Sequence, residues 1–171
     1  DDNRDGTAEA HTFIATRLEG GAPASRIPDV HGIAIGGGHV YFTTTTTILR
    51  VPYTDGLRTA DPSRLEDLRM PSHYAQGRWT HGLARSVSGT LYTSGGMIGS
   101  SCGGISSGGI YSATTGTPTP QSDGYRNPMY LRCHPRDEVC IATELGEDQT
   151  PGAREKIVRI RPEQHYGYPC C

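Results

Sequence analysis

The sequence predicts an all-β chain with the repeating architecture of a β-propeller. Glycine (23 residues) and proline (12 residues) are abundant among the 171 residues, and hydrophobic residues make up only 34%. This composition favours short strands joined by turns over helices. The segment His31–Ala34 also returns as His81–Ala84, 50 residues later. A repeat of this length, built from short strands and glycine turns, is typical of propeller blades.

Each repeat predicts the same series of strands. After the repeated segment comes a glycine turn and a tyrosine-bearing strand, and a third unit begins near Arg126. The predicted strands lie at Gly38–Thr43, Ile48–Pro52, Gly89–Thr93, Gly109–Ser112, Met129–Cys133, Val139–Thr143 and Ile157–Pro162. The run Thr43–Thr47 is β-branched and lies between apolar residues, so we expect it to be strand as well. We expect no helix of useful length.

These units place blades near residues 10–72, 73–125 and 126–171, or three to three and a half blades in one partial propeller domain. A sandwich is the alternative, but it would show turns every 8–12 residues without the long repeat. Propellers close with four to eight blades, so we expect the missing part of the same chain, or another chain, to complete the ring. Long loops at 61–72, 98–108 and 146–154 would gather at one end of the channel, where sites form.

Charge and hydropathy exclude several classes of protein. A net charge of −2 with mixed signs argues against a nucleic-acid partner. No stretch of 18 apolar residues is present, which excludes a membrane-spanning helix.

The five cysteines lie at positions 102, 133, 140, 170 and 171 and fit no zinc or thioredoxin spacing. Cys133 and Cys140 flank a turn, and we expect a disulfide across this hairpin. A disulfide persists in oxidising compartments, so we expect an extracellular or periplasmic protein. Buried thiols in a cytosolic protein are the alternative.

Two loops carry candidate binding residues. Asn127 precedes a proline and is therefore held extended, so Arg126 and Asn127 would project from a strand end, where a guanidinium can clamp a carboxylate. The alternative there is a turn with a surface arginine. The acidic loop Thr143–Asp148 offers oxygen ligands of the kind that calcium takes, although it lacks EF-hand spacing, and a solvated acidic loop is the alternative.

Two histidines are candidate general bases. His73 and His81 flank Arg78 in a segment that leads into a strand, where a base or ligand is possible. His31 and His81 share one position in the repeat, however, and this favours a structural role for both.

Taken together, these stretches resemble the pyrroloquinoline-quinone-dependent sugar dehydrogenases, the soluble glucose and sorbosone dehydrogenase family. The resemblance extends from about Ala8 to Cys171, in the family's order and near its spacing. The matching stretches are Pro28–Ala34, Val40–Thr45, Arg126–Pro128, Cys133–Pro135, Arg154–Lys156 and Tyr166–Pro169.

The resemblance implies a secreted six-bladed propeller that oxidises an aldose by hydride transfer to pyrroloquinoline quinone beside a calcium ion. A separate electron acceptor would then reoxidise the quinone. Carried over by position, Arg126 and Asn127 look like the residues that contact the quinone. The carbonyls of Gly146 and Glu147 look like calcium ligands.

One position departs from the family pattern. The family's general-base histidine corresponds to Arg78 here, and an arginine cannot accept a proton in this range. His73 or His81 would have to replace it. The alternative function is therefore a non-catalytic propeller, a binding or scaffold module that has lost the base. A calcium-dependent hydrolase of the lactonase type is a third hypothesis.

Overall fold

The computed structural model describes residues 30–57, 61–69, 81–96, 108–113, 118–146 and 154–168, and these form three β-sheets. The first sheet has the order β1-β2-β3-β4. Its strands are β1 (Ile33–Gly36), β2 (His39–Thr43), β3 (Ile48–Pro52) and β4 (Glu66–Asp67).

The second sheet has the order β12-β8-β7-β6-β5. Its strands are β5 (Leu83–Arg85), β6 (Leu91–Gly95), β7 (Gly108–Ser112), β8 (Thr119–Tyr125) and β12 (Gln164–His165). The third sheet has the order β11-β10-β9, with strands β9 (Pro128–Cys133), β10 (Cys140–Glu144) and β11 (Lys156–Arg159). All pairings are antiparallel except that of β12 with β8.

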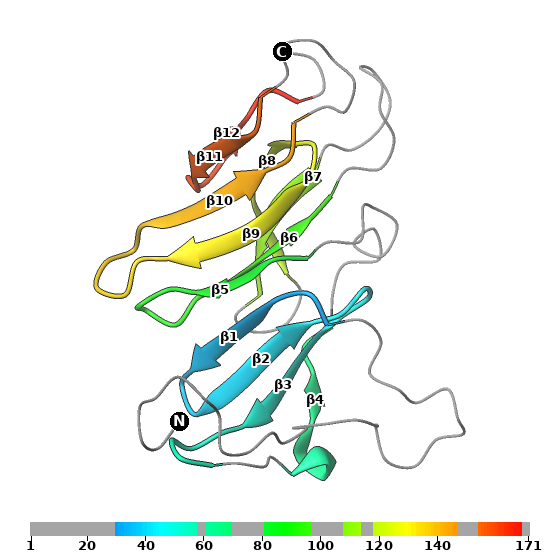
Figure 1. Ribbon diagram of the computed structural model, residues 1–171, viewed down its shortest axis with the longest axis vertical. Helices are drawn as coiled ribbons and strands as arrows, with labels where there is room; N and C mark the ends of the chain where they lie inside the picture. Colours follow the sequence, from blue (N-terminus) through cyan, green and yellow to red (C-terminus); the bar gives the residue numbers. More distant parts are fainter. Residues whose placement is uncertain are drawn as a thin grey trace, which may run out of the picture.

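The prediction of an all-β chain is confirmed. The three sheets lie one after another, and their first strands β1, β5 and β9 lie side by side (Figure 1). Within the described residues the sheets do not close into a ring, so the propeller stays a prediction. The proposed third blade, 126–171, also contributes β12 to the second sheet.

The sheets are held together by apolar side chains on facing surfaces. Alternate residues of a strand point to opposite faces, so each sheet can pack on both sides. Between the first and second sheets lie Tyr41, Ile48, Leu83, Leu91 and Ala113. Between the second and third lie Ala84, Ile110, Tyr125, Leu131, Cys140, Ala142 and Ile160.

The outer face of the third sheet is different. Tyr130, Ile141 and Ile157 occupy this face and are 67%, 38% and 74% exposed. Tyr130 and Ile157 both lie opposite Thr143 in the strand register, so they belong to one cross-strand row. This apolar face is left open by the described residues.

Two local predictions were wrong. Thr44–Thr47 forms a turn between β2 and β3, because the Thr44 hydroxyl accepts hydrogen bonds from Thr46 N (3.2 Å) and Thr47 N (3.1 Å). The segment predicted as a loop at 61–72 contains a 3-10 turn, Pro62–Arg64, and strand β4. An Arg50–Glu66 ion pair at 2.6 Å helps to hold β4 beside β3.

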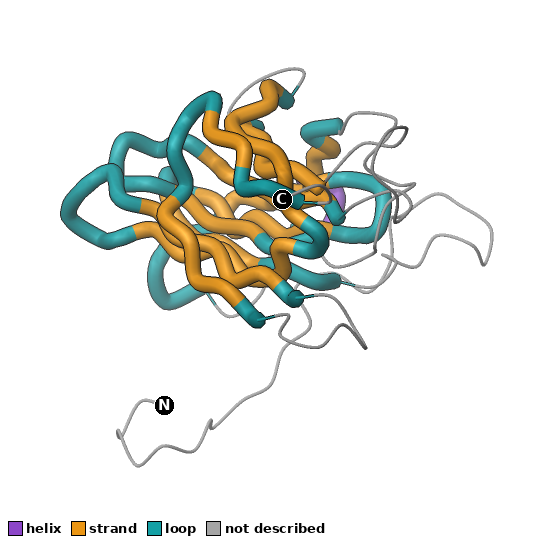
Figure 2. Tube along the Cα trace, turned by 90° about the horizontal axis from the view of Figure 1, so that it is seen from above, coloured by secondary structure: helices purple, strands orange, loops and turns teal. Residues whose placement is uncertain are grey.

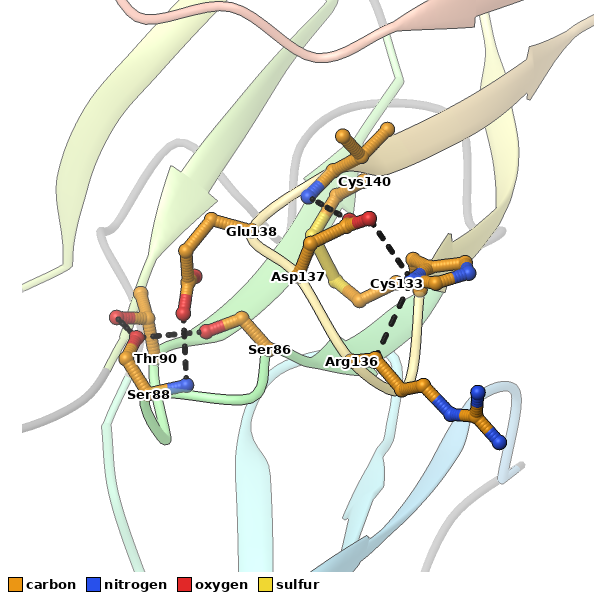
Figure 3. The surroundings of a disulfide bond; sticks show 10 residues. Ser86, Ser88, Thr90, Cys133, Arg136, Asp137, Glu138 and Cys140 are labelled. Carbon is orange, nitrogen blue, oxygen red and sulfur yellow. Dashed lines mark hydrogen bonds and ion pairs between the residues drawn. A yellow bond between two sulfur atoms is a disulfide. The ribbon is translucent and has the colours of Figure 1, made fainter.

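The predicted disulfide is confirmed. Cys133 and Cys140 are bonded across the β9–β10 hairpin and lie opposite each other in its register (Figure 3). Separately, no helix in the described ranges reaches the length and apolarity that crossing a membrane requires.

The strands β1, β5 and β9 define two ends of the molecule. Each is followed by a hairpin turn on the same side, at the left of Figure 1, and the view from above shows loops gathered on that side (Figure 2). We call this side the turn end. The opposite side, where the three strands begin, is the start end.

Candidate functional site

The start end brings together the residues that precede the three first strands. His31 precedes β1, His81 precedes β5, and Arg126 with Asn127 precede β9. The strands approach closely here, because a Cβ on Gly32 would lie 2.8 Å from the His81 carbonyl oxygen and one on Gly82 would lie 2.5 Å from that of Met129. The repeat of the sequence is thus a repeat of position in space.

Arg126 is a buried charged residue at this end. Sequence reasoning expected it to project outward, but it is only 4% exposed, and Asn127 is 5% exposed. The Arg126 guanidinium donates to the carbonyl oxygen of Gly146, and the Asn127 carbonyl accepts a hydrogen bond from Leu145 N at 3.2 Å. Arg126, Asn127 and Gly146 therefore meet in a buried cluster.

Glu144 completes this group, which we call the Arg126 cluster (Arg126, Asn127, Glu144 and Gly146). The Glu144 carboxylate is 3% exposed, and its Oε1 accepts a hydrogen bond from the backbone N–H of Arg126 at 2.7 Å. Its Oε2 is buried without a hydrogen bond and has Lys156 Nζ at 3.7 Å. The carboxylate therefore holds the backbone that leads into β9 and lies near the positive charge of Lys156.

Sequence reasoning missed Glu144 as a site residue. The sequence marks the acidic loop that contains Glu144, but it assigns specific roles only to the carbonyls of Gly146 and Glu147. The signal that could have found it is position: Glu144 is the last residue of β10 and lies opposite Pro128 in the register. A carboxylate at that place meets the backbone that leads into β9.

A pair of aromatic rings supports the cluster from the second sheet. Tyr125 is fully buried and stacks on Tyr166, with ring centroids 4.8 Å apart. Its hydroxyl lies 3.0 Å from Ser122 Oγ, and burial raises the pKa of Tyr125 above its ordinary value. Tyr125 is thus held in place, and the backbone of Arg126, which follows it, is held in place with it.

His81 is built into the structure. It is 1% exposed, its Nδ1 lies 2.9 Å from the Ser94 carbonyl oxygen, and its ring meets the edge of His31 with centroids 5.8 Å apart. Burial lowers the pKa of His81 to about 4. A general base must reach its proton and have a pKa near the working pH, and this arrangement gives His81 neither property.

The remaining predicted site residues are not all described. His73, Arg78 and Glu147 lie outside the described residues. In the ranges that are described, no three histidine, cysteine or acidic side chains gather as a metal site. The predicted roles of these residues stay predictions.

Comparison with known proteins gives a likeness of fold. No family model matches the chain, and no curated protein matches it. A solved structure of a Trichoderma reesei carbohydrate-active enzyme of family AA12 matches with a TM-score of 0.64 and 19% identity, over 81% of this chain. The match covers 43% of the length of that enzyme.

This finding corrects the family resemblance. The predicted relation to the soluble glucose and sorbosone dehydrogenase family is wrong, because the similar solved structure belongs to a different family, AA12. Of the stretches that carried the resemblance, Arg126–Pro128 and Cys133–Pro135 lie at the two ends of β9, and Val40–Thr43 lies within β2. At 19% identity the structural likeness shows the shared fold alone.

Proposed function

We propose that this chain forms part of an enzyme that oxidises a carbohydrate with pyrroloquinoline quinone, and that the Arg126 cluster binds the quinone. The observation that carries this proposal is the buried Arg126 at the start end, whose guanidinium donates to the Gly146 carbonyl and whose backbone N–H donates to the Glu144 carboxylate. The likeness to a carbohydrate-active enzyme supports a carbohydrate as the substrate class.

The proposal includes the architecture. We infer that the three sheets are consecutive blades of a propeller, because each packs face to face on the next. A further antiparallel sheet would then cover the exposed face that carries Tyr130, Ile141 and Ile157. The greater length of the similar enzyme supports this reading, since 43% of it already corresponds to the present chain.

The residues of the cluster fit a quinone that carries carboxylates. A guanidinium binds a carboxylate through paired, charge-assisted hydrogen bonds, and Asn127 adds an amide beside it. Glu144 acts on the backbone of Arg126 and so keeps the arginine in place. When bound, the quinone supplies the redox chemistry by accepting a hydride from a carbon that bears a hydroxyl group.

The described residues of the loop do not fit a calcium ion. Calcium takes six to eight oxygen ligands, whereas the Gly146 carbonyl already accepts from a guanidinium, and a cation bound there would lie beside that positive charge. Glu144 is the cluster's one carboxylate. We derive no step through calcium, and the predicted role of Glu147 lies outside the described residues.

The proton of the substrate hydroxyl needs a base, and His81 is buried away from any substrate. This observation favours a second candidate function, a propeller module that binds the quinone or a carbohydrate without turnover. Arg78, at the position where a base was expected, favours it too. The two functions share one binding site and differ in whether sugar is oxidised.

A secreted or periplasmic location belongs to the same proposal. The Cys133–Cys140 disulfide supports an oxidising compartment.

The test uses the full-length protein with added pyrroloquinoline quinone, a panel of aldoses and a redox dye as electron acceptor. We expect sugar-dependent dye reduction that requires the quinone. Arg126→Gln should weaken quinone binding by at least about tenfold, the effect of one lost charge-assisted contact. Arg64→Gln, an exposed arginine in the first sheet's 3-10 turn, is the matched control.

Unchanged quinone affinity in folded Arg126→Gln would contradict the proposed site. Quinone binding without dye reduction would favour the non-catalytic module.

A further inference from the structure

A cavity lies at the turn end, on the opposite side from the Arg126 cluster. Its volume is about 620 Å³, within the usual range for small-molecule sites. Strands β1, β5 and β9 and the turns that follow β5 and β9 line it. Its walls combine apolar side chains with two arginines, namely Ile33, Ile35, Leu83, Val87, Arg85 and Arg132.

Arg85 is held in this region by the shape of two hairpin turns. A Cβ on Gly36 would lie 2.8 Å from Arg85 Nη1, and one on Gly89 would lie 2.8 Å from Nη2. Gly36 belongs to the first sheet's hairpin and Gly89 to the second's. Both glycines therefore leave room for the guanidinium, which lies between two neighbouring sheets.

The guanidinium has no acceptor among the described residues. Arg85 Nε is buried and makes no hydrogen bond, and no ion pair joins Arg85 to a described carboxylate. A buried donor without an acceptor costs stability, and the cost is larger when the donor is charged. The Arg85 guanidinium would therefore be stabilised by an acceptor that the described residues do not supply.

The carboxylates of the nearby β9–β10 turn are engaged elsewhere. Asp137 accepts from Val139 N at 2.9 Å and pairs with His134 Nδ1 at 3.0 Å. Glu138 accepts a hydrogen bond from Ser88 N at 2.8 Å, and its carboxylate points to the β5–β6 turn that contains Ser88 (Figure 3). These contacts account for both acids and leave the charge of Arg85 uncompensated by them.

We propose that the turn-end cavity binds a small ligand with an oxyanion, a carboxylate or a phosphate, attached to an apolar body. Arg85 binds the oxyanion, and exposed Arg132 adds a second positive charge at the cavity wall. The apolar part lies against Ile33, Ile35 and Val87, which are 63%, 59% and 52% exposed. This site is independent of the quinone proposal, because it lies at the other end of the strands.

The experiment measures binding to the full-length protein by calorimetric titration with four probes. Phenylphosphate and phenylacetate carry the two oxyanions on an apolar ring, 2-phenylethanol carries the ring without charge, and inorganic phosphate carries charge without the ring. We expect both aromatic anions to bind more tightly than the other two probes. Their relative affinities distinguish a phosphate from a carboxylate ligand, and added salt should weaken both.

The variants locate the site. Arg85→Gln should lower the affinity for the aromatic anions by at least about tenfold, and Arg132→Gln should lower it less. Arg64→Gln should bind as the wild type does. If Arg85→Gln fails to fold, Arg132→Gln and the salt dependence decide, because exposed Arg132 is not needed for packing. Equal affinity for 2-phenylethanol, or wild-type binding by both folded variants, overturns the proposal.

Discussion

The strands β1, β5 and β9 have a buried arginine near the start end, Arg126, and a partly buried one near the turn end, Arg85. The two arginines are held in place in different ways. At the start end, Arg126 N donates to Glu144 Oε1 at 2.7 Å and His81 Nδ1 lies 2.9 Å from the Ser94 carbonyl oxygen, whereas Glu144 Oε2 is buried without a hydrogen bond. At the turn end, Arg85 is positioned by glycine backbone and makes no hydrogen bond through its buried Nε. Arg126 is thus held by hydrogen bonds, whereas Arg85 is held by the shape of the surrounding backbone.

This difference indicates how each end can bind a ligand. Hydrogen bonds hold Arg126 in one orientation, which suits a cofactor that must be placed accurately against a substrate. Steric confinement leaves the donors of Arg85 directed at whatever anion enters. The same strands thus carry the Arg126 cluster, whose donors are fixed by hydrogen bonds, and the turn-end cavity, where Arg85 has no acceptor among the described residues.

The largest expected effect concerns His81 at the start end. Its pKa in the fold is about 4, below the ordinary value of 6.5, so the unfolded chain binds a proton more readily. Above pH 6.5 His81 is neutral in both states and does not reduce the free energy of unfolding. As the pH falls from 6.5 towards 4, protonation of the unfolded chain lowers the free energy of unfolding by about 3 kcal/mol. Denaturant unfolding of wild type and His81→Gln across this range measures it.

In His81→Gln this contribution is absent, so the gap in unfolding free energy between the two proteins should shrink as the pH falls. A gap that is independent of pH would show that His81 titrates normally in the fold.

A smaller effect is expected from the disulfide at the turn end. Replacing Cys133 and Cys140 together by alanine should lower the free energy of unfolding by about 2 kcal/mol, because a short closed loop constrains the unfolded chain modestly. The double variant is preferable to reduction, since Cys102, Cys170 and Cys171 stay unchanged. Quinone affinity should not change; a loss would mean that the two ends are coupled.

The smallest effect comes from two glycine-to-alanine changes, which distinguish the steric effect of a new Cβ on Arg85 from backbone strain. Gly38 and Gly89 both have a positive φ, +74° and +98°. A Cβ at Gly38 meets no atom within 4 Å, whereas at Gly89 it would lie 2.8 Å from the Arg85 guanidinium. Each change to alanine should cost about 1 kcal/mol of stability from strain, measured by thermal unfolding. Only Gly89→Ala should also weaken phenylphosphate binding, and equal weakening by both would contradict the role given to Arg85.

Most strands could be predicted because their signals are local. The repeated His-Gly segment marks the starts of β1 and β5, glycine turns follow, and period-2 apolar residues face the neighbouring sheets. The disulfide was also predictable, since Cys133 and Cys140 flank one turn. These features need only a few consecutive residues.

The missed features depend on contacts between distant segments. Strand β8 (Thr119–Tyr125) contains proline, serine, aspartate and glycine, which disfavour strands, and it forms because β7 and β12 pair with it. Glu144 became part of the site only when the register of β9 and β10 placed it beside Arg126. The burial of Arg126 likewise follows from how the sheets pack.

The central claim is that the quinone binds at the start end and not in the turn-end cavity, although both ends carry an arginine. Hydrogen–deuterium exchange of the full-length protein, with and without pyrroloquinoline quinone, tests this directly. We expect slower exchange at residues 124–128 and 143–146, including the amide of Arg126, and no change at 85–89. Slower exchange confined to 85–89 would place the quinone on Arg85 and would show that the proposed quinone site is wrong.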